Sequence, residues 1–550
     1  MKISHLKVNG VKAPLGYRFD YLTFSWRLEG QLEPLEECSV EISKSETFAE
    51  ILWSGTTKSS FNTISTNANF LEPKTKYYWR VCFGKIEAIS TFETSKMNEP
   101  WEAKWLSYKE ETKESISFVK KFSFLKKIKQ ARLYTVAHGL YEVYINGVKL
   151  GDEYLTPGYH SYDLLQQYQT YDVTECLIED TEISFIVGNG WYRGRFLFEG
   201  GFENIYGDKQ KLIAELHVEY TDGTLEQFYS DETWTVETNY IQENSIYDGE
   251  IINYTAEINA LTTEVIDVTT LLLAPRLDLP VEVVAEFQPR IFFDTKNQMV
   301  LDFGQEITGW IFTELLEDKE YVRFQFGELL QNGAFYTENL RTAKQEFVIK
   351  NAKKGVKVRP HFTYFGFRYV KVEGLTQDEA VLVIAQALQS KMDETFEFSS
   401  SNTKLNQLIS NIRWSQKDNF LSIPTDCPQR DERMGWTGDI TVFANTASYN
   451  METRAFLGHF LKMVELEQEH LNGAVPFFAP FPKVKLCTVV SSKTIFPVLF
   501  IEKSLFLKKP TTFSPTTSIF KLFILLIGLA LLSAETPLEI ETPTFSFPLV

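Results

Sequence analysis

The sequence predicts a multidomain protein in which N-terminal all-β sandwich and jelly-roll domains come first and a helical domain follows. The chain has 550 residues, which is too long for a single core at roughly 100–200 residues per domain. Up to about residue 390, short segments rich in aromatic and β-branched residues alternate with turn residues, a pattern typical of sandwiches. Helical periodicity starts only near residue 399.

Shifts in composition divide the chain into consecutive parts. The segment KMNEPWEA at 96–103 is interpreted as a linker after the first sandwich, and LAPRLDLPVEV closes the second β unit. In chain order, the predicted parts are a fibronectin-III-like β-sandwich at 1–98, a jelly-roll module at 115–285, a β-sandwich at 286–390, the first helices of a further domain at 395–482 and a divergent tail at 483–550.

A β-hairpin is predicted at 140–151, in the stretch LYEVYINGVKLG. Apolar and polar residues alternate on both sides of Asn146 and Gly147. These two residues readily adopt the positive φ angles that a two-residue hairpin turn needs. The hairpin is the clearest local signal in the β-rich part.

Two amphipathic helices are predicted in the fourth part. The first begins near residue 399, behind serine and asparagine residues that can cap it. Its apolar residues recur at i, i+3, i+4 and i+7, namely Leu405, Leu408, Ile409 and Ile412. The second spans 451–471, and Asn472-Gly473 ends it. A loop between such helices is where we expect a pocket.

Charge and cysteine content exclude several classes of function. The net charge is −18 and no basic run occurs, so we expect no nucleic-acid partner and no attraction to an anionic membrane. The five cysteines and seven histidines are scattered without CxxC or HExxH spacing, so we expect no metal site, no disulfide framework and no cofactor. The N-terminal residues lack an apolar signal-peptide core, and we expect a cytoplasmic protein.

The stretch TDCPQRDERMGWTGD at 425–439 places four carboxylates and two arginines between the two predicted helices. One interpretation is a solvated loop held by ion pairs, which contribute little to stability. The other is a site at which carboxylates act chemically. Pro428 restricts the backbone, and the indole of Trp436 among acids suits the stacking of a sugar ring. Glycoside hydrolysis needs two carboxyl groups, one with a raised pKa, but the spacing does not choose among these acids.

The charged stretch at 425–439 resembles the signature of the bacterial α-L-rhamnosidases, glycoside hydrolase family 78. The resemblance is specific because the stretch is long, charged and irregular. It covers roughly residues 1–480 in a consistent domain order. The further stretches that are similar to this family are LYEVYINGVKLGDEYLTPGYHSYD (140–163), VGNGWYRGRF (187–196), LDFGQEITGW (301–310), GELLQNGAFYTENLRTA (327–343) and PHFTYFGFRYVKVEG (360–374).

This resemblance implies hydrolysis of terminal non-reducing α-L-rhamnose residues with inversion, in an (α/α)6 barrel that accessory β-sandwiches precede. By motif position, Glu432 is expected to be the general acid. Asp426 and Asp439 are expected to hold rhamnose hydroxyls and to tune Glu432. Arg430 is expected to grip a hydroxyl or orient a carboxylate, and Trp436 to line the pocket.

Other residues in the family-like stretches have two interpretations each. Asp431 and Arg433 could serve the site or only the structure of the loop. Cys427 is expected to be a packed small residue rather than a nucleophile, since no histidine lies near it in sequence. Asn189 and Trp191 are a candidate accessory sugar contact in the jelly roll, or else a turn with a packed tryptophan.

An inverting enzyme also needs a general base, which in the family comes from a later barrel helix. The family-like sequence ends near residue 482. We therefore expect the general base to be missing and the barrel to be incomplete, and we expect the chain to have little hydrolytic activity. The tail at 483–550 contains LFILLIGLALL (522–532), which is shorter than the ~20 residues of a membrane-spanning helix. A membrane anchor and a divergent domain are alternatives, but we favour a frame disruption.

The sequence leaves three functions open. The first is an α-L-rhamnosidase with an incomplete barrel. The second is a non-catalytic carbohydrate-binding fragment, and the third is a related glycosidase that acts on another deoxy sugar or a uronide. The expected partners are rhamnose-containing glycosides or oligosaccharides, without nucleic acid or membrane, and a homodimer is a conceivable assembly.

Overall fold

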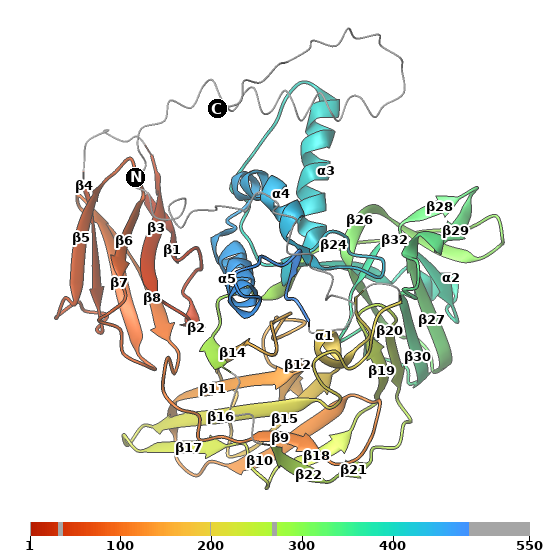
Figure 1. Cartoon of the computed structure of the whole chain (residues 1–550), viewed down its shortest axis with the longest axis horizontal. Helices are drawn as coiled ribbons and strands as arrows, with labels where there is room; N and C mark the ends of the chain where they lie inside the picture. Colours follow the sequence, from red (N-terminus) through yellow and green to blue (C-terminus); the bar gives the residue numbers. More distant parts are fainter. Residues whose placement is uncertain (1, 31–36, 198–199, 267–271, 483–550) are drawn as a thin grey trace. The chain divides into compact units, whose positions relative to one another are not determined.

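The N-terminal β-sandwich forms because its strands alternate between buried and more exposed residues. In the computed structural model, which describes residues 2–30, 37–197, 200–266 and 272–482, every second side chain of β7 is buried (Figure 1). The two sheets have the strand orders β1-β3-β6 and β2-β8-β7-β4-β5. The strands are β1 (Lys2–Val8), β2 (Leu15–Tyr17), β3 (Tyr21–Glu29), β4 (Glu37–Ser43), β5 (Trp53–Lys58), β6 (Thr63–Asn67), β7 (Lys76–Phe83) and β8 (Ile86–Thr94).

The second β unit is a jelly roll of two packed sheets. Their strand orders are β13-β12-β15-β10-β18-β21 and β22-β9-β16-β11-β14-β23, and β17 pairs with β16. The elements are β9 (Trp105–Tyr108), β10 (Ile116–Ser123), β11 (Ile128–His138), β12 (Leu140–Ile145), β13 (Val148–Lys149), β14 (Leu165–Asp172), β15 (Asp180–Gly188), α1 (Gly190–Arg193), β16 (Lys211–Tyr220), β17 (Leu225–Tyr229), β18 (Thr235–Thr238), β21 (Ala260–Leu261), β22 (Thr263–Ile266) and β23 (Leu272–Pro275).

The predicted hairpin at 140–151 is present in this jelly roll. β12 pairs with β13 in antiparallel register, with Ile145 opposite Val148. Asn146 and Gly147 between them have φ angles of 49° and 78°. Both values are positive, as the two-residue turn requires.

The third β unit is one sheet of ten strands, in the order β19-β20-β30-β27-β32-β26-β33-β24 with β25 and β31 pairing on β26. The hairpin β19–β20 comes from the middle of the jelly-roll sequence, and β20 pairs in parallel with β30. The elements are β19 (Ile241–Ser245), β20 (Gly249–Asn253), β24 (Val281–Phe287), β25 (Arg290–Phe293), β26 (Met299–Glu314), β27 (Lys319–Gly327), β28 (Leu329–Gln331), β29 (Ala334–Tyr336), η1 (Glu338–Leu340), β30 (Glu346–Ala352), β31 (Lys357–Val358), β32 (Phe365–Glu373), α2 (Gln377–Ala380) and β33 (Ile384–Ser390).

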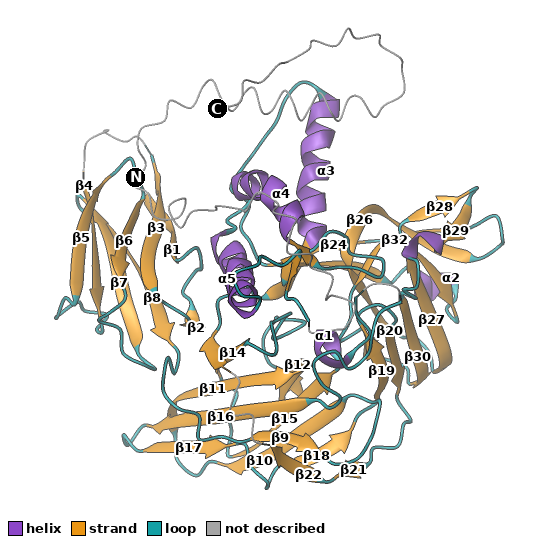
Figure 2. Cartoon of the chain, viewed as in Figure 1, coloured by secondary structure: helices purple, strands orange, loops and turns teal. Residues whose placement is uncertain are grey.

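The longer helices lie in the last described part of the chain, as Figure 2 shows. Two of them confirm the predicted helices: Asn402 caps the first with its side chain, and the second ends before Asn472. The third, α4, was not predicted. The elements are α3 (Thr403–Asn419), β34 (Phe420–Leu421), β35 (Ile423–Pro424), β36 (Gly435–Trp436), α4 (Thr437–Asn450), α5 (Arg454–His470) and β37 (Phe478–Ala479).

A shared hydrophobic core joins the inner side of the jelly roll, the third sheet and the helices. It contains Trp191 from the jelly roll, Trp310 from the third sheet and Phe460 from α5, each at most 2% exposed. The rings of Phe420 and Phe456 stack within it, with centroids 4.6 Å apart. This packing stabilises the helices against the β units, because most helical stability comes from burying an apolar face.

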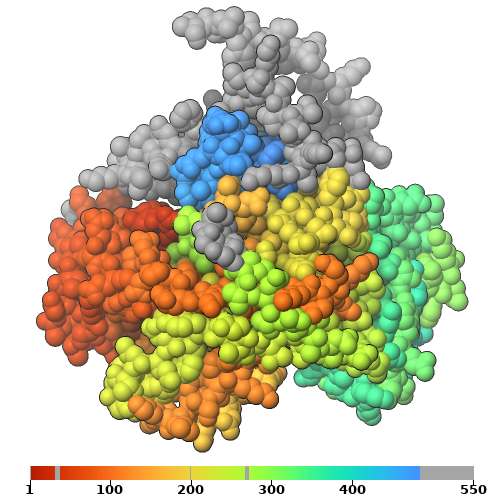
Figure 3. All heavy atoms as spheres, turned by 60° about the horizontal axis from the view of Figure 1, so that its bottom comes forward, coloured from red at the N-terminus to blue at the C-terminus, as the bar shows by residue number. Residues whose placement is uncertain are grey.

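The fold class predicted from the sequence, β-sandwich and jelly-roll domains followed by helices, is confirmed. Figure 3 shows a face of the molecule on which jelly-roll residues, coloured orange to yellow-green, form much of the surface. In the part of the chain that the structure describes, no helix is long and apolar enough to cross a membrane. The predicted divergent tail at 483–550, with its suggested frame disruption, lies outside the described residues.

Candidate active site

The charged stretch begins as a loop and ends as a helix. Residues 425–434 connect β35 to β36, and α4 begins at Thr437, so Asp439 lies in the first turn of a helix. This corrects the expectation that the whole stretch at 425–439 is a loop. An acidic residue in a first turn is stabilised by the positive end of the helix dipole. A side chain at Gly435 would place Cβ 2.4 Å from the carbonyl oxygen of Ala479, so glycine permits the pairing of β36 with β37.

Arg433 fixes the shape of this loop from the inside. Its side chain is fully buried, and its φ angle is 53°. The guanidinium donates hydrogen bonds to the carbonyl oxygens of Arg430 (3.0 Å), Gln429 (2.7 Å), Ile246 (2.9 Å) and Tyr364 (2.9 Å) and to Oε1 of Gln345 (3.3 Å). The planar guanidinium of arginine can donate hydrogen bonds to acceptors on several sides at once, which the compact ammonium group of lysine cannot do in the same geometry. Arg433 therefore acts through the structure of the loop.

Glu432 is held in the loop by two cations. Nη1 of Arg341 lies 2.9 Å from Oε2 of Glu432, and Nε of Arg430 lies 3.2 Å from the same oxygen. The side chain of Glu432 is 13% exposed. The hydroxyl of Tyr247 donates a hydrogen bond to the backbone oxygen of Glu432 at 2.7 Å. Both the backbone and the carboxyl group of Glu432 are thus fixed in place.

Asp426 supplies the like charge that the sequence analysis expected beside Glu432. A carboxylate oxygen of Asp426 lies within 4.8 Å of a carboxylate oxygen of Glu432. Burial and, second to it, the charge of Asp426 raise the pKa of Glu432, while Arg430 and Arg341 act in the opposite direction. The raised pKa lets Glu432 keep its proton at a higher pH than an exposed glutamate, as a general acid requires.

The position of Asp426 also limits what it can do. Its Oδ2 lies 3.3 Å from Nη2 of Arg430, and its Oδ1 accepts the backbone N–H of Met434 at 3.3 Å. In inverting glycosidases the two catalytic carboxyl groups stand roughly 6.5–9.5 Å apart, which leaves room for a water molecule. Asp426 is closer than that to Glu432, so it suits hydroxyl binding and tuning of Glu432 rather than the role of general base.

Trp436 and Asp439 lie at the start of α4. Trp436 is the N-cap residue, is half-buried and packs edge-on against Phe478, with ring centroids 5.5 Å apart. Asp439 is exposed. The structure therefore brings Asp426, Arg430 and Glu432 into direct contact and places Trp436 and Asp439 at the start of α4.

Sequence reasoning missed the contribution of the third β unit to this site. Arg341 reaches Glu432 from just after η1, and the hydroxyl of Thr342 donates to Oδ2 of Asp431 at 2.6 Å. The one available signal was the sequence ENLRTA, which lies in a stretch similar to the rhamnosidases. Nothing in that sequence indicated which later carboxylate the arginine would meet.

The candidate accessory sugar contact at Asn189 and Trp191 is corrected by the structure. Trp191 is 1% exposed and stacks on Tyr159, with ring centroids 5.4 Å apart, so neither face of the indole is open to a ligand. Asn189 donates two hydrogen bonds to Asn244, from its backbone N–H and its side-chain amide, and its Oδ1 accepts from Gln210 at 2.8 Å. Both residues serve the packing of the turn.

Cys427 behaves as the packed residue expected from the sequence. It is 5% exposed, and burial raises the pKa of its thiol to about 12. The thiol lies close enough to Asp426 and Glu432 for the three to surround a metal ion. A metal would need the thiolate, however, and Arg430 already pairs with both acids, so this group does not suit a metal.

Four family models match this chain, and all of them describe parts of α-L-rhamnosidases. In chain order they are the Rha78A-like N-terminal immunoglobulin domain (3–98), the α-L-rhamnosidase N-terminal domain (126–291), the bacterial α-L-rhamnosidase concanavalin-like domain (294–391) and the bacterial α-L-rhamnosidase 6 hairpin glycosidase domain (393–495). The chain belongs to the bacterial α-L-rhamnosidase family. The resemblance read from the charged stretch is confirmed.

Individual members of the family align with most of this chain. A curated α-L-rhamnosidase of Alteromonas sp. is 30% identical over 88% of the chain and 57% of its own length, and one of Formosa agariphila is 31% identical over 86% and 56%. The solved α-L-rhamnosidase of Aspergillus terreus superposes with a TM-score of 0.81 at 32% identity, covering 87% of this chain and 59% of its own. The chain thus spans a little over half the length of these rhamnosidases.

Proposed function

We propose that this chain binds terminal α-L-rhamnose at the loop 425–436 and the start of α4, and that Glu432 donates the proton to the leaving glycosidic oxygen. The observation that supports this proposal is the coupling of Glu432 to Asp426 in a partly buried loop, which raises the pKa of Glu432. A protonated carboxyl near neutral pH is what the departure of an alkoxide requires. Its relatives are named as rhamnosidases, which supports rhamnose as the sugar.

The residues around Glu432 offer groups that can bind the hydroxyls and the C–H face of a sugar ring. Asp426 and Arg430 offer an acceptor and a donor for sugar hydroxyls, and the half-buried indole of Trp436 offers a face for the C–H side of the ring. Asp439 offers a second, exposed carboxylate at the start of α4. Inversion would need a further carboxylate to activate water, and the expectation that this general base comes from a later helix stays a prediction.

Calorimetric titration of the full-length chain with L-rhamnose tests this proposal. We expect binding by the wild type and a loss of affinity in Trp436→Ala and Asp426→Asn. L-Fucose and D-glucuronate serve as comparison sugars, because a related glycosidase of other specificity would prefer one of them. Tyr449→Ala, which removes an exposed ring elsewhere on α4, is the matched control. Tighter binding of a comparison sugar would contradict the assignment of rhamnose.

A further inference from the structure

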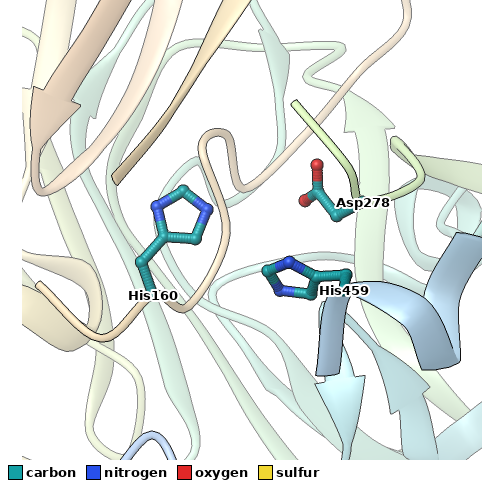
Figure 4. A group of neighbouring side chains, drawn as sticks. All are labelled: His160, Asp278 and His459. Atoms are coloured by element: carbon teal, nitrogen blue, oxygen red, sulfur yellow. The ribbon is translucent and has the colours of Figure 1, made fainter. Parts of the chain in front are cut away.

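Three buried side chains from distant parts of the sequence meet away from the catalytic loop. His160 follows the hairpin of the jelly roll, Asp278 follows β23, and His459 lies in α5. One nitrogen or oxygen atom from each lies within 4.8 Å of the other two, and Figure 4 shows the three side chains turned toward a common point. They are 0%, 4% and 0% exposed, respectively.

The imidazole of His160 has no hydrogen-bonding partner for either ring nitrogen among the described residues. A buried polar group without a partner destabilises the folded state, so it calls for an explanation such as a bound ion. One ring nitrogen of His160 therefore has a lone pair that no described donor occupies, whereas Nδ1 of His459 accepts from the amide of Gln167. Neutral imidazole is the form that binds metals.

We propose that His160, Asp278 and His459 bind one divalent transition-metal ion of the Zn²⁺ class. Two imidazoles and one carboxylate form a donor set that Zn²⁺ accepts, at about 2.0–2.2 Å per bond. Around a tetrahedral ion with such bonds, donor atoms stand about 3.4 Å apart. Since the three donor atoms lie within 4.8 Å of one another, each pair needs to close by at most about 1.4 Å.

Gln167 orients the ring of His459 but also competes with an ion for its Nδ1. Its Oε1 accepts the backbone N–H of Leu277 at 2.5 Å and of Asp278 at 3.3 Å, so its amide nitrogen faces Nδ1 of His459 at 2.6 Å. Nδ1 is then the acceptor, and the ion takes its lone pair in place of the amide proton.

The charges around the site favour a cation. Arg276 donates to Oδ1 of Asp278 at 3.2 Å and to Glu153 at 2.7 Å. One guanidinium thus faces two carboxylates, and a net negative charge stays available to a divalent ion. The ion would tie α5 to the jelly roll beside the existing hydrogen bond from Ser161 to Glu467, at 2.6 Å. It would therefore stabilise the fold, independently of any hydrolytic function.

Cobalt titration of the full-length chain, after dialysis against EDTA, tests the site. We expect about one Co²⁺ per chain by elemental analysis, with visible d–d absorption, and a higher Tm on addition of Zn²⁺. His160→Gln and His459→Gln should abolish both effects. His217→Gln, which alters a histidine beside Glu215 in the jelly roll, is the matched control and should retain them. Far-UV circular dichroism verifies that each variant is folded.

A variant that keeps all three ligands supplies the second arm of the test. Gln167→Ala removes the amide proton that competes for Nδ1, so we expect Co²⁺ to bind several-fold more tightly than to the wild type. Failure of the wild type to bind Co²⁺ or Zn²⁺ stoichiometrically would overturn the proposal. Undiminished binding in both folded histidine variants would overturn it as well.

Discussion

Arg341, which follows the third β unit's short 3-10 helix, forms an ion pair with Glu432 of the loop 425–434, with Nη1 and Oε2 2.9 Å apart. The side chain of Arg341 is about half exposed (49%), whereas that of Glu432 is largely shielded (13%). The β domain thus supplies a cation that orients the proposed acid and opposes the rise in its pKa. The strength of that opposition can be measured.

Replacing Arg341 by glutamine should raise the pKa of Glu432. The substitution removes a cation that favours the ionised carboxylate, and burial and the charge of Asp426 then act with less opposition. The pKa is measured by NMR titration of ¹³C-labelled glutamate carboxyls, with Glu432→Gln used to assign the signal. Arg323→Gln removes an equal charge from the same β unit beside Glu346 and should leave the signal in place. An unchanged pKa in Arg341→Gln would show that the ion pair does not act on the acid.

Asp426→Asn should lower the pKa of Glu432, because the like charge that raises it is removed. The basic limb of a pH–rate profile would then move to lower pH, since Glu432 would lose its proton more readily. Asp439→Asn removes the same charge from an exposed position, where solvent and salt screen it, so its effect on the pKa should be smaller. Both variants should weaken the binding of L-rhamnose. If both variants bind L-rhamnose with wild-type affinity, the stretch at 425–439 is a solvated ion-pair loop rather than a sugar site.

Arg433→Lys should lower the free energy of unfolding by about 3 kcal/mol or more, because several buried carbonyl oxygens lose their donor. Arg430→Lys is the matched control: this side chain is 33% exposed and its ion pairs are partly solvated, so we expect a loss of about 1 kcal/mol or less. Denaturant titration followed by tryptophan fluorescence measures both. Similar losses in the two variants would contradict the assignment of Arg433 as the internal anchor of the loop.

Asp418→Asn should make the stability of the protein less sensitive to a rise in pH between about 4 and about 8. Burial raises the pKa of Asp418 to about 8 in the folded state, whereas an unfolded aspartate titrates near 3.9, roughly. Between these values the folded state binds the extra proton, so the stability contributed by this group falls as the pH rises from about 4 to about 8. Asparagine keeps the carbonyl that accepts the N–H of Thr308 and has no proton to lose. Tm measured from pH 5 to pH 9 should decline less in the variant, and an equal decline would contradict the prediction.

Local chemistry decided which elements could be predicted from the sequence. The hairpin turn at Asn146-Gly147 and the helices α3 and α5 carry their signals within a few residues. The sequence of α4, TGDITVFANTASYN, has an i, i+3, i+4, i+7 repeat at Ile440, Phe443, Ala444 and Ala447, but two of these residues are alanines and the segment is rich in Thr, Ser and Asn, so the helical signal is weak. Contacts with the rest of the chain determine whether such a segment forms a helix. The pairing of β20 with β30 depends equally on residues far apart in sequence.

The site was predictable where its residues are neighbours in the chain. Asp426, Arg430 and Glu432 lie within one short stretch, and the family resemblance assigned their roles. Arg341 reaches that stretch from far upstream, and sequence spacing gives no means of pairing it with Glu432. Trp191 was left with two interpretations, an accessory sugar contact or a packed tryptophan, because a tryptophan in a glycine-rich turn has the same sequence signature whether its ring is exposed or buried.

His160 and His459 are a second case in which sequence spacing does not reveal a contact between distant residues. The sequence contains no metal-binding spacing, since His160, Asp278 and His459 are separated by more than a hundred residues at each step. Metal-ligand motifs are recognisable in a sequence only when the ligands share a loop or a helix face. Here three separate segments bring them together, and only the structure shows it.

The leaving-group dependence of Glu432→Gln tests the central claim most directly. Because the chain spans 57% of the Alteromonas relative, the measurement uses a chimera in which the remaining part of that enzyme follows residue 482. If Glu432 is the general acid, the variant should lose about 10²–10⁴-fold in turnover on a rhamnoside with a poor leaving group and far less on 2,4-dinitrophenyl α-L-rhamnoside, which needs no protonation to depart. Equal losses on both substrates would contradict the assignment of Glu432 as the acid.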